Sequence, residues 1–361
     1  MNKSILPFLF CTLLCGCNNS HNLTMLVGTY TDTDSKGIYT FTFNEDNGTA
    51  SALSATEVKN PSFLTVTPDR KMVYSVSEQA EGASVSAFDF DKATGELHFR
   101  NSRPTKGRGP CHVTIVGHDV VSANYSSGTI SVFPTDEKGN LQEAVLLQFN
   151  ESGPDSTRQE QSHLHSTQVS PDGKFLFAID LGGDYIYRFP VADGKVTAYD
   201  ATKIKMPLGS GPRHFDFSKD HRFMYVINEL SGSVVAYDYN NGDLRQIQEI
   251  QADILYARGS ADIHFSPDGK FLYASNRLQG DGIAIFRQDA TSGLLERVGY
   301  QNTAIHPRNF AITPNGKYVL VACRDDNVVQ VFARDAQTGL LRDTHQDIRV
   351  PRAVCVILVT T

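Results

Sequence analysis

Short apolar runs that follow turn residues recur along the chain. The clearest copies, at 170–177, 266–273 and 313–320, begin with Ser/Thr-Pro-Asp/Asn-Gly-Lys and continue as an apolar run such as Phe-Leu-Tyr. In this turn, proline restrains one backbone angle and glycine accepts a positive φ, so the chain reverses between two strands. Degenerate copies lie at 67–74, 117–121 and 218–225. The pattern predicts antiparallel strands along the chain rather than helices.

The turns are evenly spaced. Their anchor positions are 68, 117, 171, 219, 267 and 314, which lie 49, 54, 48, 48 and 47 residues apart. Repeats of about 40 to 50 residues that are bounded by turns are typical of propeller blades. Each unit contains four candidate strands, because the run after the turn is followed by a glycine-containing loop, a third run such as 232–237, and a hairpin such as Asn241-Gly242.

The two ends of the chain supply the parts of one more blade. The run 351–359 has the pattern of a first strand, whereas 25–30 and 37–43 have the pattern of a second and a third strand. Pairing these ends in one sheet would close the ring and remove an exposed strand edge. We therefore predict an all-β, seven-bladed β-propeller with four antiparallel strands per blade, formed by residues 25–361 as one domain.

Composition narrows the class of protein. The chain is 40% hydrophobic and 20% charged, which excludes a disordered chain and a membrane protein with several spans. Tryptophan is absent, which argues against the Trp-Asp type of propeller repeat. The net charge of −7 argues against a nucleic-acid partner.

The N-terminal segment has a different pattern. Lys3 precedes an apolar run at 5–14, which is too short to span a bilayer and ends in Leu-Cys-Gly-Cys at 14–17. This resembles a bacterial lipoprotein signal that is cleaved before Cys17 and acylated on its thiol. We expect residues 1–16 to be a signal peptide and 17–24 an acylated tether. The mature protein would then lie on the periplasmic side of the envelope, at the outer membrane, with the lipid as its only membrane contact. A plain secretory signal is the alternative, and it also exports the chain.

Three cysteines remain after Cys17, namely Cys111, Cys323 and Cys355, and they show no Cys-x-x-Cys spacing. We predict that they are buried small apolar residues, with one disulfide as the alternative.

Two columns of residues should meet at one mouth of the central channel, where first strands begin and second strands end. The first column, five and six residues before each anchor, contains Ser62-Phe63, Cys111-His112, His165-Ser166, Arg213-His214, Ala261-Asp262, Arg308-Asn309 and Arg352-Ala353. The second column lies about ten residues after each anchor. It contains Glu78, Tyr125, Leu181, Glu229, Arg277 and Arg324, and Tyr30 completes it in the closing blade. Five arginines and three histidines would repel one another unless an anion compensated them. The columns therefore predict a pocket for a small anionic ligand. In the alternative, these side chains pair with one another and close the channel.

The repeats, together with the motifs at 27–30 (Val-Gly-Thr-Tyr), 211–214 (Gly-Pro-Arg-His) and 275–277 (Ser-Asn-Arg), resemble the propeller-type lactonase family over residues 25–361. That family contains bacterial 6-phosphogluconolactonases and the fungal carboxy-muconate cyclase. In the cyclase, a His, an Arg, a Glu and a second Arg on one face are the proposed functional residues. By motif context, the similar residues of this chain are His165, Arg213, Glu229 and Arg277.

The resemblance implies a lactone hydrolase of the 6-phosphogluconolactonase type, which opens a sugar lactone to the acid. In this reaction a base activates water and a donor stabilises the developing oxyanion. Glu229 or His165 is the expected base, and Arg213 and Arg277 are expected to hold the oxyanion and any phosphate or carboxylate. The further residues expected to bind substrate are His214, His112, Tyr30 and Arg308. Arg308, Arg324 and Arg352 lie in the same columns but lack the family match, so we expect them to surround the site.

Two other function classes stay open. A cycloisomerase would use the same groups without water, and a non-catalytic propeller would only bind a ligand or a protein at its mouth. His163 and His165 could together face a metal, but no further ligand has suitable spacing, so we expect no metal site. No phosphate-cradling loop or Gly-x-Ser-x-Gly motif is present, and no cofactor is expected. 6-Phosphogluconolactone is a cytoplasmic metabolite, whereas the signal exports this chain. Either the family name overstates the substrate, or the exported protein acts on an unphosphorylated sugar lactone.

Overall fold

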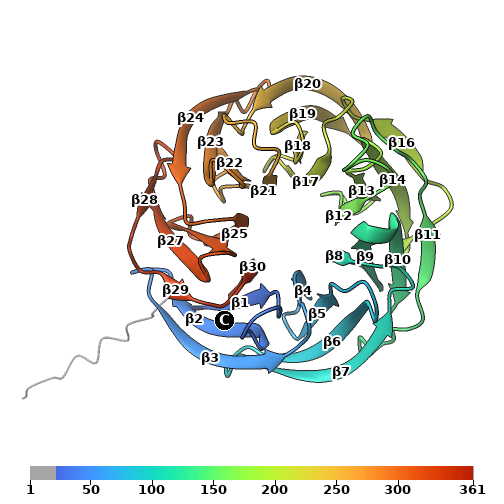
Figure 1. Cartoon of the computed structure of the whole chain (residues 1–361), viewed down its shortest axis with the longest axis horizontal. Coiled ribbons are helices and arrows are strands. Elements are labelled where there is room, and N and C mark those ends of the chain that lie inside the picture. The colour runs from blue at the N-terminus through green and yellow to red at the C-terminus, as the bar shows by residue number, and fades with distance from the viewer. Residues whose placement is uncertain (1–21, 361) are drawn as a thin grey trace, which may run out of the picture.

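The computed structural model describes residues 22–360, which form seven β-sheets arranged around a central channel (Figure 1). Five sheets have four strands and two have five, and consecutive strands of each sheet run antiparallel. This confirms the predicted seven-bladed β-propeller. The inner strands begin at one face of the ring, which we call the mouth, and the Pro-Asp-Gly turns lie at the opposite face, which we call the turn face.

From the channel outward, the ring-closing blade consists of β30 (Ala353–Thr360), β1 (Asn22–Thr29), β2 (Gly37–Asn44) and β3 (Ala50–Glu57). The next blade consists of β4 (Leu64–Val66), β5 (Met72–Ser77), β6 (Ser84–Asp91) and β7 (Glu96–Pro104). The third consists of β8 (Pro110–Val116), β9 (Asp119–Asn124), β10 (Thr129–Pro134) and β11 (Val145–Gln148), with the short 3-10 helix η1 (Tyr125–Ser127) after β9.

The fourth blade consists of β12 (Leu164–Val169), β13 (Phe175–Asp180), β14 (Tyr185–Ala192), β15 (Lys195–Val196) and β16 (Thr202–Lys205). The fifth consists of β17 (Pro212–Phe217), β18 (Phe223–Asn228), β19 (Ser233–Asn240) and β20 (Asp243–Gln251). The sixth consists of β21 (Ser260–Phe265), β22 (Phe271–Asn276), β23 (Gly282–Gln288) and β24 (Leu295–Asn302). The seventh consists of β25 (Pro307–Ile312), β26 (Tyr318–Cys323), β27 (Val328–Arg334), β28 (Leu341–Asp343) and β29 (Ile348–Arg349).

The two ends of the chain close the ring in one sheet. β1 pairs antiparallel with β30, from Leu23 opposite Thr360 to Thr29 opposite Ala353. This confirms the predicted closure. β1 begins at Asn22, so the predicted tether at 17–24 overlaps the strand, because Leu23 is buried in the core of this blade. The predicted signal peptide and lipidation site lie outside the described residues.

Apolar side chains fill the spaces between neighbouring blades. All six residues of β5 are buried, whereas most residues of the outer strand β3 are partly or fully exposed, since an inner strand is covered on both faces by adjacent sheets. Cys111, Cys323 and Cys355 are buried and free, as predicted for small core residues. The described residues contain no helix that is long and apolar enough to cross a membrane.

A β-bulge or a similar register shift interrupts the inner strand near the mouth in six consecutive blades. These irregularities lie in β8, β12, β17, β21, β25 and β30, and in five of these strands the extra residue is Cys111, His165, Arg213, Arg308 or Val354. In a regular strand, neighbouring side chains point to opposite faces, but a bulge changes the direction of one of them. The bulges therefore allow consecutive residues of one strand to reach the channel.

Candidate active site

The carboxylate of Glu229 lies among three guanidinium groups. Arg213 Nε donates to Oε2 at 3.0 Å, Arg277 Nη2 lies 3.2 Å from Oε2, and Arg158 Nη2 donates to Oε1 at 2.5 Å. Burial by itself would raise the pKa of Glu229, but Arg277, Arg213 and Arg158 lower this pKa to about 2. Glu229 is therefore ionised, and both of its oxygens are occupied by arginine side chains.

Backbone carbonyls hold the two inner arginines. Arg213 Nη1 donates to the carbonyl of Ala261 at 2.5 Å, and Arg277 Nε donates to the carbonyl of Gly259 at 2.7 Å. Only 1% of Arg213 and 5% of Arg277 is exposed, so neither guanidinium can move far. Burial lowers the pKa of Arg277 to about 9, with the repulsion of Arg213 adding to the effect and Glu229 opposing it.

The segment before Arg213 depends on glycine. Gly211 has a φ of +57°, and a Cβ atom on it would lie 2.4 Å from Leu230 Cγ. The carbonyl of Gly211 accepts the backbone N–H of Glu229 at 2.7 Å. The Gly-Pro-Arg-His motif thus places the start of β17 against the end of β18, which brings Arg213 beside Glu229.

Arg158 was missed by the sequence analysis, because it lies outside both columns. It belongs to the loop between β11 and β12, whose inserted residues account for the 54-residue spacing of the anchors at 117 and 171. Asp155 of this loop pairs with Arg258, and Gln159 Nε2 donates to the carbonyl of Leu181 at 2.9 Å. The Arg158 guanidinium also donates to Tyr125 Oη at 3.3 Å. The uneven spacing was the one signal that could have indicated this loop.

Three imidazole rings form a layer across the channel. The ring centroids of His165 and His214 lie 5.2 Å apart, those of His112 and His214 lie 5.5 Å apart, and Phe63 stacks on His112 at 4.1 Å. Burial lowers the pKa of each histidine, that of His214 to about 4 and those of the other two well below 6.5. All three imidazoles are therefore neutral at neutral pH.

His165 differs from the other two histidines in its hydrogen bonding. It is buried, and its Nδ1 has no hydrogen-bond partner among the described residues. By contrast, His112 Nδ1 accepts the backbone N–H of Thr167 at 3.4 Å, and His214 Nδ1 lies 2.7 Å from an oxygen of Asp262. A buried nitrogen without a partner is costly unless a ligand or water supplies one.

Arg308 has no counter-charge in direct contact. Its guanidinium lies over the Tyr30 ring, 5.6 Å from the centroid, and it makes no ion pair or hydrogen bond within the part of the chain that the structure describes. The Tyr30 hydroxyl instead donates to Glu78 at 3.0 Å, and Ser62 donates to the same carboxylate. Arg308 is therefore suited to bind an anion.

The remaining predicted residues do not join this cluster. Arg324 pairs with Asp325 at 2.8 Å, and Arg352 pairs with Asp32 at 2.9 Å and with Asp325 at 2.7 Å. His163 stacks on Tyr125, with the centroids 4.4 Å apart. Within residues 22–360, no group of three or more histidine, cysteine or acidic side chains is arranged to hold a metal.

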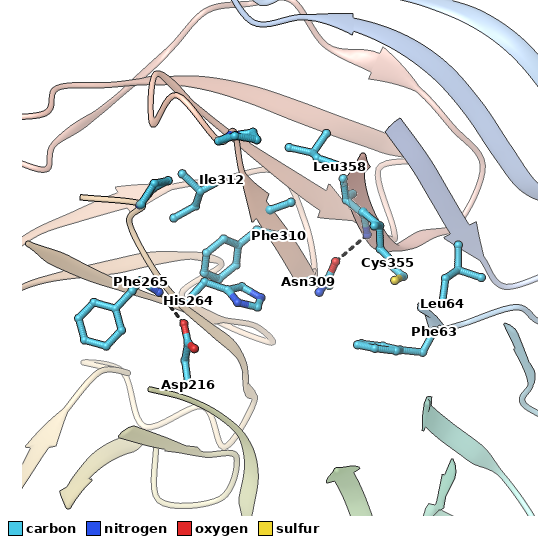
Figure 2. A pocket seen from close by; sticks show the side chains of 15 residues that line it. Phe63, Leu64, Asp216, His264, Phe265, Asn309, Phe310, Ile312, Cys355 and Leu358 are labelled. Atoms are coloured by element: carbon cyan, nitrogen blue, oxygen red, sulfur yellow. Dashed lines mark hydrogen bonds between the residues drawn. The ribbon is translucent and has the colours of Figure 1, made fainter. Parts of the chain in front are cut away.

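A separate cavity of about 360 Å³ lies elsewhere in the channel wall (Figure 2). Apolar side chains such as Phe63, Phe265 and Phe310 line it, together with Asp216 and His264. None of the four residues suggested by the family resemblance contributes to this lining. The charged cluster at the mouth, not this cavity, is the candidate active site.

The fold and the site together define a seven-bladed propeller with a channel mouth that is rich in arginine and suited to an anionic ligand. The family model described as "Lactonase, 7-bladed beta-propeller" matches residues 24–358. The chain therefore belongs to this lactonase family.

Individual relatives align over nearly the whole chain. A 6-phosphogluconolactonase of Formosa agariphila is 39% identical, with 90% of this chain and 96% of the relative covered. The structure of a candidate 6-phosphogluconolactonase from Bacteroides fragilis is 52% identical, with a TM-score of 0.91 and coverage of 94% and 98%. The periplasmic gluconolactonase of Pseudomonas aeruginosa is 32% identical, with a TM-score of 0.89 and coverage of 94% and 99%.

Proposed function

We propose that this protein hydrolyses a sugar lactone at the channel mouth. One observation carries the proposal: the neutral imidazole of His165 lies among the arginines of the mouth. In the described part of the chain, His165 Nδ1 has no hydrogen-bond partner and the guanidinium of Arg308 has no counter-charge in contact. Lactone opening needs a base for water and positive charge for the oxyanion, and this mouth supplies both.

In the proposed reaction, His165 accepts a proton from water while the water oxygen bonds to the lactone carbonyl carbon. Negative charge develops on the carbonyl oxygen, where guanidinium groups of the mouth stabilise it. The ring C–O bond then breaks, and the proton on His165 passes to the leaving oxygen. The product is the open hydroxy acid, whose carboxylate is left beside the arginines.

Glu229 is assigned a different role from the base. Both oxygens of its carboxylate already accept from arginines, so Glu229 has no unoccupied oxygen to take a proton from water. We assign Glu229 to holding Arg213 and Arg277 in place. Arg308 and Arg158 then remain to contact the developing oxyanion and the product carboxylate, because Arg308 has no carboxylate partner among the described residues and 37% of the Arg158 side chain is exposed.

We also propose that the chain is an exported lipoprotein, acylated at Cys17, which acts on an unphosphorylated sugar lactone. The Leu-Cys-Gly-Cys sequence at 14–17 and the likeness to a periplasmic gluconolactonase support this proposal. The names of other relatives support 6-phosphogluconolactone as the competing substrate.

Purified protein should be assayed with gluconolactone, with 6-phosphogluconolactone and with a carboxy-muconate, each corrected for spontaneous reaction. Faster opening of plain gluconolactone supports the proposal, whereas preference for the phosphorylated lactone would overturn the substrate assignment. Turnover of the muconate alone would favour a cycloisomerase. Ligand binding without any turnover would favour a non-catalytic propeller.

A further inference from the structure

Asp262 lies at the centre of a hydrogen-bond network that joins three inner strands. Its Oδ1 lies 2.7 Å from His214 Nδ1, on β17, and its Oδ2 lies 2.9 Å from His264 Nε2, on β21 itself. From β25, Asn309 Nδ2 donates to Oδ2 at 2.6 Å and the backbone N–H of Phe310 donates at 3.2 Å. His264 and Asn309 reach this region of the channel from neighbouring strands (Figure 2). Asp262 is only 1% exposed, so water cannot replace these donors.

The contacts of Asp262 keep its side chain ionised. Burial acts to raise its pKa, but His264 and the hydrogen bonds from the two histidines hold this pKa well below its usual range. Burial by itself would lower the pKa of His264, but the contact with Asp262 raises this pKa to about 9. His264 is therefore an imidazolium at neutral pH. Asp262 is therefore an ionised carboxylate, which can only accept hydrogen bonds.

This charge state determines the tautomer of His214. Because Asp262 only accepts, the proton of the neutral His214 ring must be on Nδ1. His214 Nε2 then carries a lone pair, and it lies 3.5 Å from Nη1 of Arg213. The opposite tautomer would place an N–H of His214 against an N–H of the guanidinium, and the two donors would repel each other.

We propose that Asp262 is a positioning residue for the proposed hydrolysis: it holds His214 in the Nδ1–H tautomer, so that His214 Nε2 faces Arg213 as an acceptor. Through this contact, Asp262 keeps Arg213 aligned with Glu229. The role in turnover rests on the proposed function, but the tautomer itself does not.

An Asp262→Asn variant reverses the hydrogen bonding without changing the shape of the side chain. Asn309 and Phe310 donate to the Oδ2 position, so the amide oxygen is expected there and the amide NH2 at the Oδ1 position. The NH2 group would donate to His214 Nδ1 and move the ring proton to Nε2. We expect kcat to fall by about 10- to 100-fold, with KM changed by less than about threefold.

The tautomer is measured from ¹⁵N chemical shifts of protein labelled in histidine, with the His214 signals assigned by their loss in a His214→Gln variant. We expect an Nδ1–H form in the wild type and an Nε2–H form in Asp262→Asn. The matched control is Asp216→Asn, since within residues 22–360 Asp216 accepts only the backbone N–H groups of Phe217 and Phe265, each at 2.8 Å. This control should keep the wild-type tautomer and kcat/KM.

An Nε2–H form in the wild type would overturn the proposal whatever the activity, and this measurement does not need the Asp262→Asn variant to fold. An Asp262→Asn protein that keeps the Nδ1–H form, or keeps full kcat with the tautomer reversed, would overturn it as well. Wild-type protein without lactonase activity, but with the Nδ1–H form, would instead overturn the proposed function and support the placement of His214 by Asp262.

Discussion

At the level of single residues, Glu229 and His165 differ in what surrounds their titrating atoms. Glu229 is bound by three guanidinium groups, whereas Nδ1 of His165 has no partner among the described residues. The amino-acid sequence alone left both residues open as the base. The contacts favour His165, because a base must have a free lone pair at the pH of the reaction.

Replacing His165 by Asn should lower kcat by roughly 10²- to 10⁴-fold, since a general base contributes about that factor. The melting temperature should change little, because the ring nitrogen Nδ1 has no hydrogen bond to lose. Steady-state kinetics and thermal unfolding check both expectations. A variant with wild-type kcat would remove His165 from the mechanism.

Replacing Glu229 by Gln should mainly lower the stability of the protein. The variant leaves the buried guanidinium groups of Arg213 and Arg277 without a counter-charge, so we expect the free energy of unfolding to fall by about 3–5 kcal/mol. Urea unfolding measures this loss. The control is Glu78→Gln, whose carboxylate is bound by the hydroxyls of Tyr30 and Ser62 and should cost less. A Glu229→Gln protein as stable as the control would contradict the ion-pair role.

Stability should also decrease in mild acid. Burial holds the pKa values of His112, His165, His214 and His306 below the ordinary value of 6.5, that of His306 at about 2. The unfolded chain therefore binds protons below pH 6.5 while these rings stay neutral in the fold. The contribution of these four rings to stability is fully present above pH 6.5 and is lost as the pH falls toward their folded pKa values.

Urea unfolding at pH 7 and pH 5 measures this effect. One such histidine lowers the free energy of unfolding by roughly 1.4 kcal/mol per pH unit, so four of them should lower it several times as much. In a His306→Asn variant, the free energy of unfolding should depend less steeply on pH, by about the contribution of one histidine. Asparagine suits this position, because His306 has a φ of +65° and asparagine tolerates that conformation. Equal stability at the two pH values would contradict the neutral state of the buried rings.

At the level of elements, the loop between β11 and β12 completes the mouth from outside the repeat pattern. Its Arg158 reaches Glu229 and Tyr125 but makes no contact with a backbone carbonyl within the described structure, unlike Arg213 and Arg277. A partly exposed guanidinium on a loop can exchange its carboxylate partner for an oxygen of an incoming ligand more readily than a buried one.

An Arg158→Gln variant should therefore raise KM by roughly 10- to 100-fold, which is the loss expected for one hydrogen bond to a charged group. The melting temperature should stay close to that of the wild type. Arg108→Gln is the matched control, because Arg108 is exposed on the loop between β7 and β8 and its side chain has no partner in the described part of the chain. Equal KM values in the two variants would exclude Arg158 from ligand binding.

At the level of the whole molecule, stability depends on closure of the ring by β1 and β30. Deleting residues 351–361 would remove an entire inner strand and expose the edge of β1. We expect the melting temperature to fall by at least about 10 °C. Deleting residues 360–361 alone removes one residue pair of this ladder and is the control. Equal melting temperatures for both truncations would contradict closure by these strands.

The geometry of the ring also bears on the proposed lipid anchor. β1 runs from Asn22, at the turn face, to Thr29, at the mouth, so a tether that precedes it joins the face opposite to the active site. Replacing Cys17 by Ala should therefore release the protein from the membrane fraction with kcat/KM unchanged. Mass spectrometry should find an acylated N-terminal cysteine in the wild type only. A soluble wild-type protein without lipid would contradict the anchor.

The amino-acid sequence alone determined the number of blades, the closing strands and the two columns at the mouth. Each of these follows from local chemistry, because Pro-Asp-Gly turns at a near-constant period set the positions of the strands, and the strand positions set which residues meet at the mouth. The same periodicity placed Arg213, Glu229 and Arg277 together.

The protonation state and the partners of those side chains follow from how the blades pack against one another. The pKa of Glu229, the missing partner of His165 Nδ1 and the network around Asp262 depend on distances between blades, which no local pattern encodes. Arg158 was found only in the structure, because a loop without the repeat carries it across the mouth to Glu229, 71 residues away in sequence. Periodicity predicts which residues converge, but burial and charge pairing determine what each of them can do.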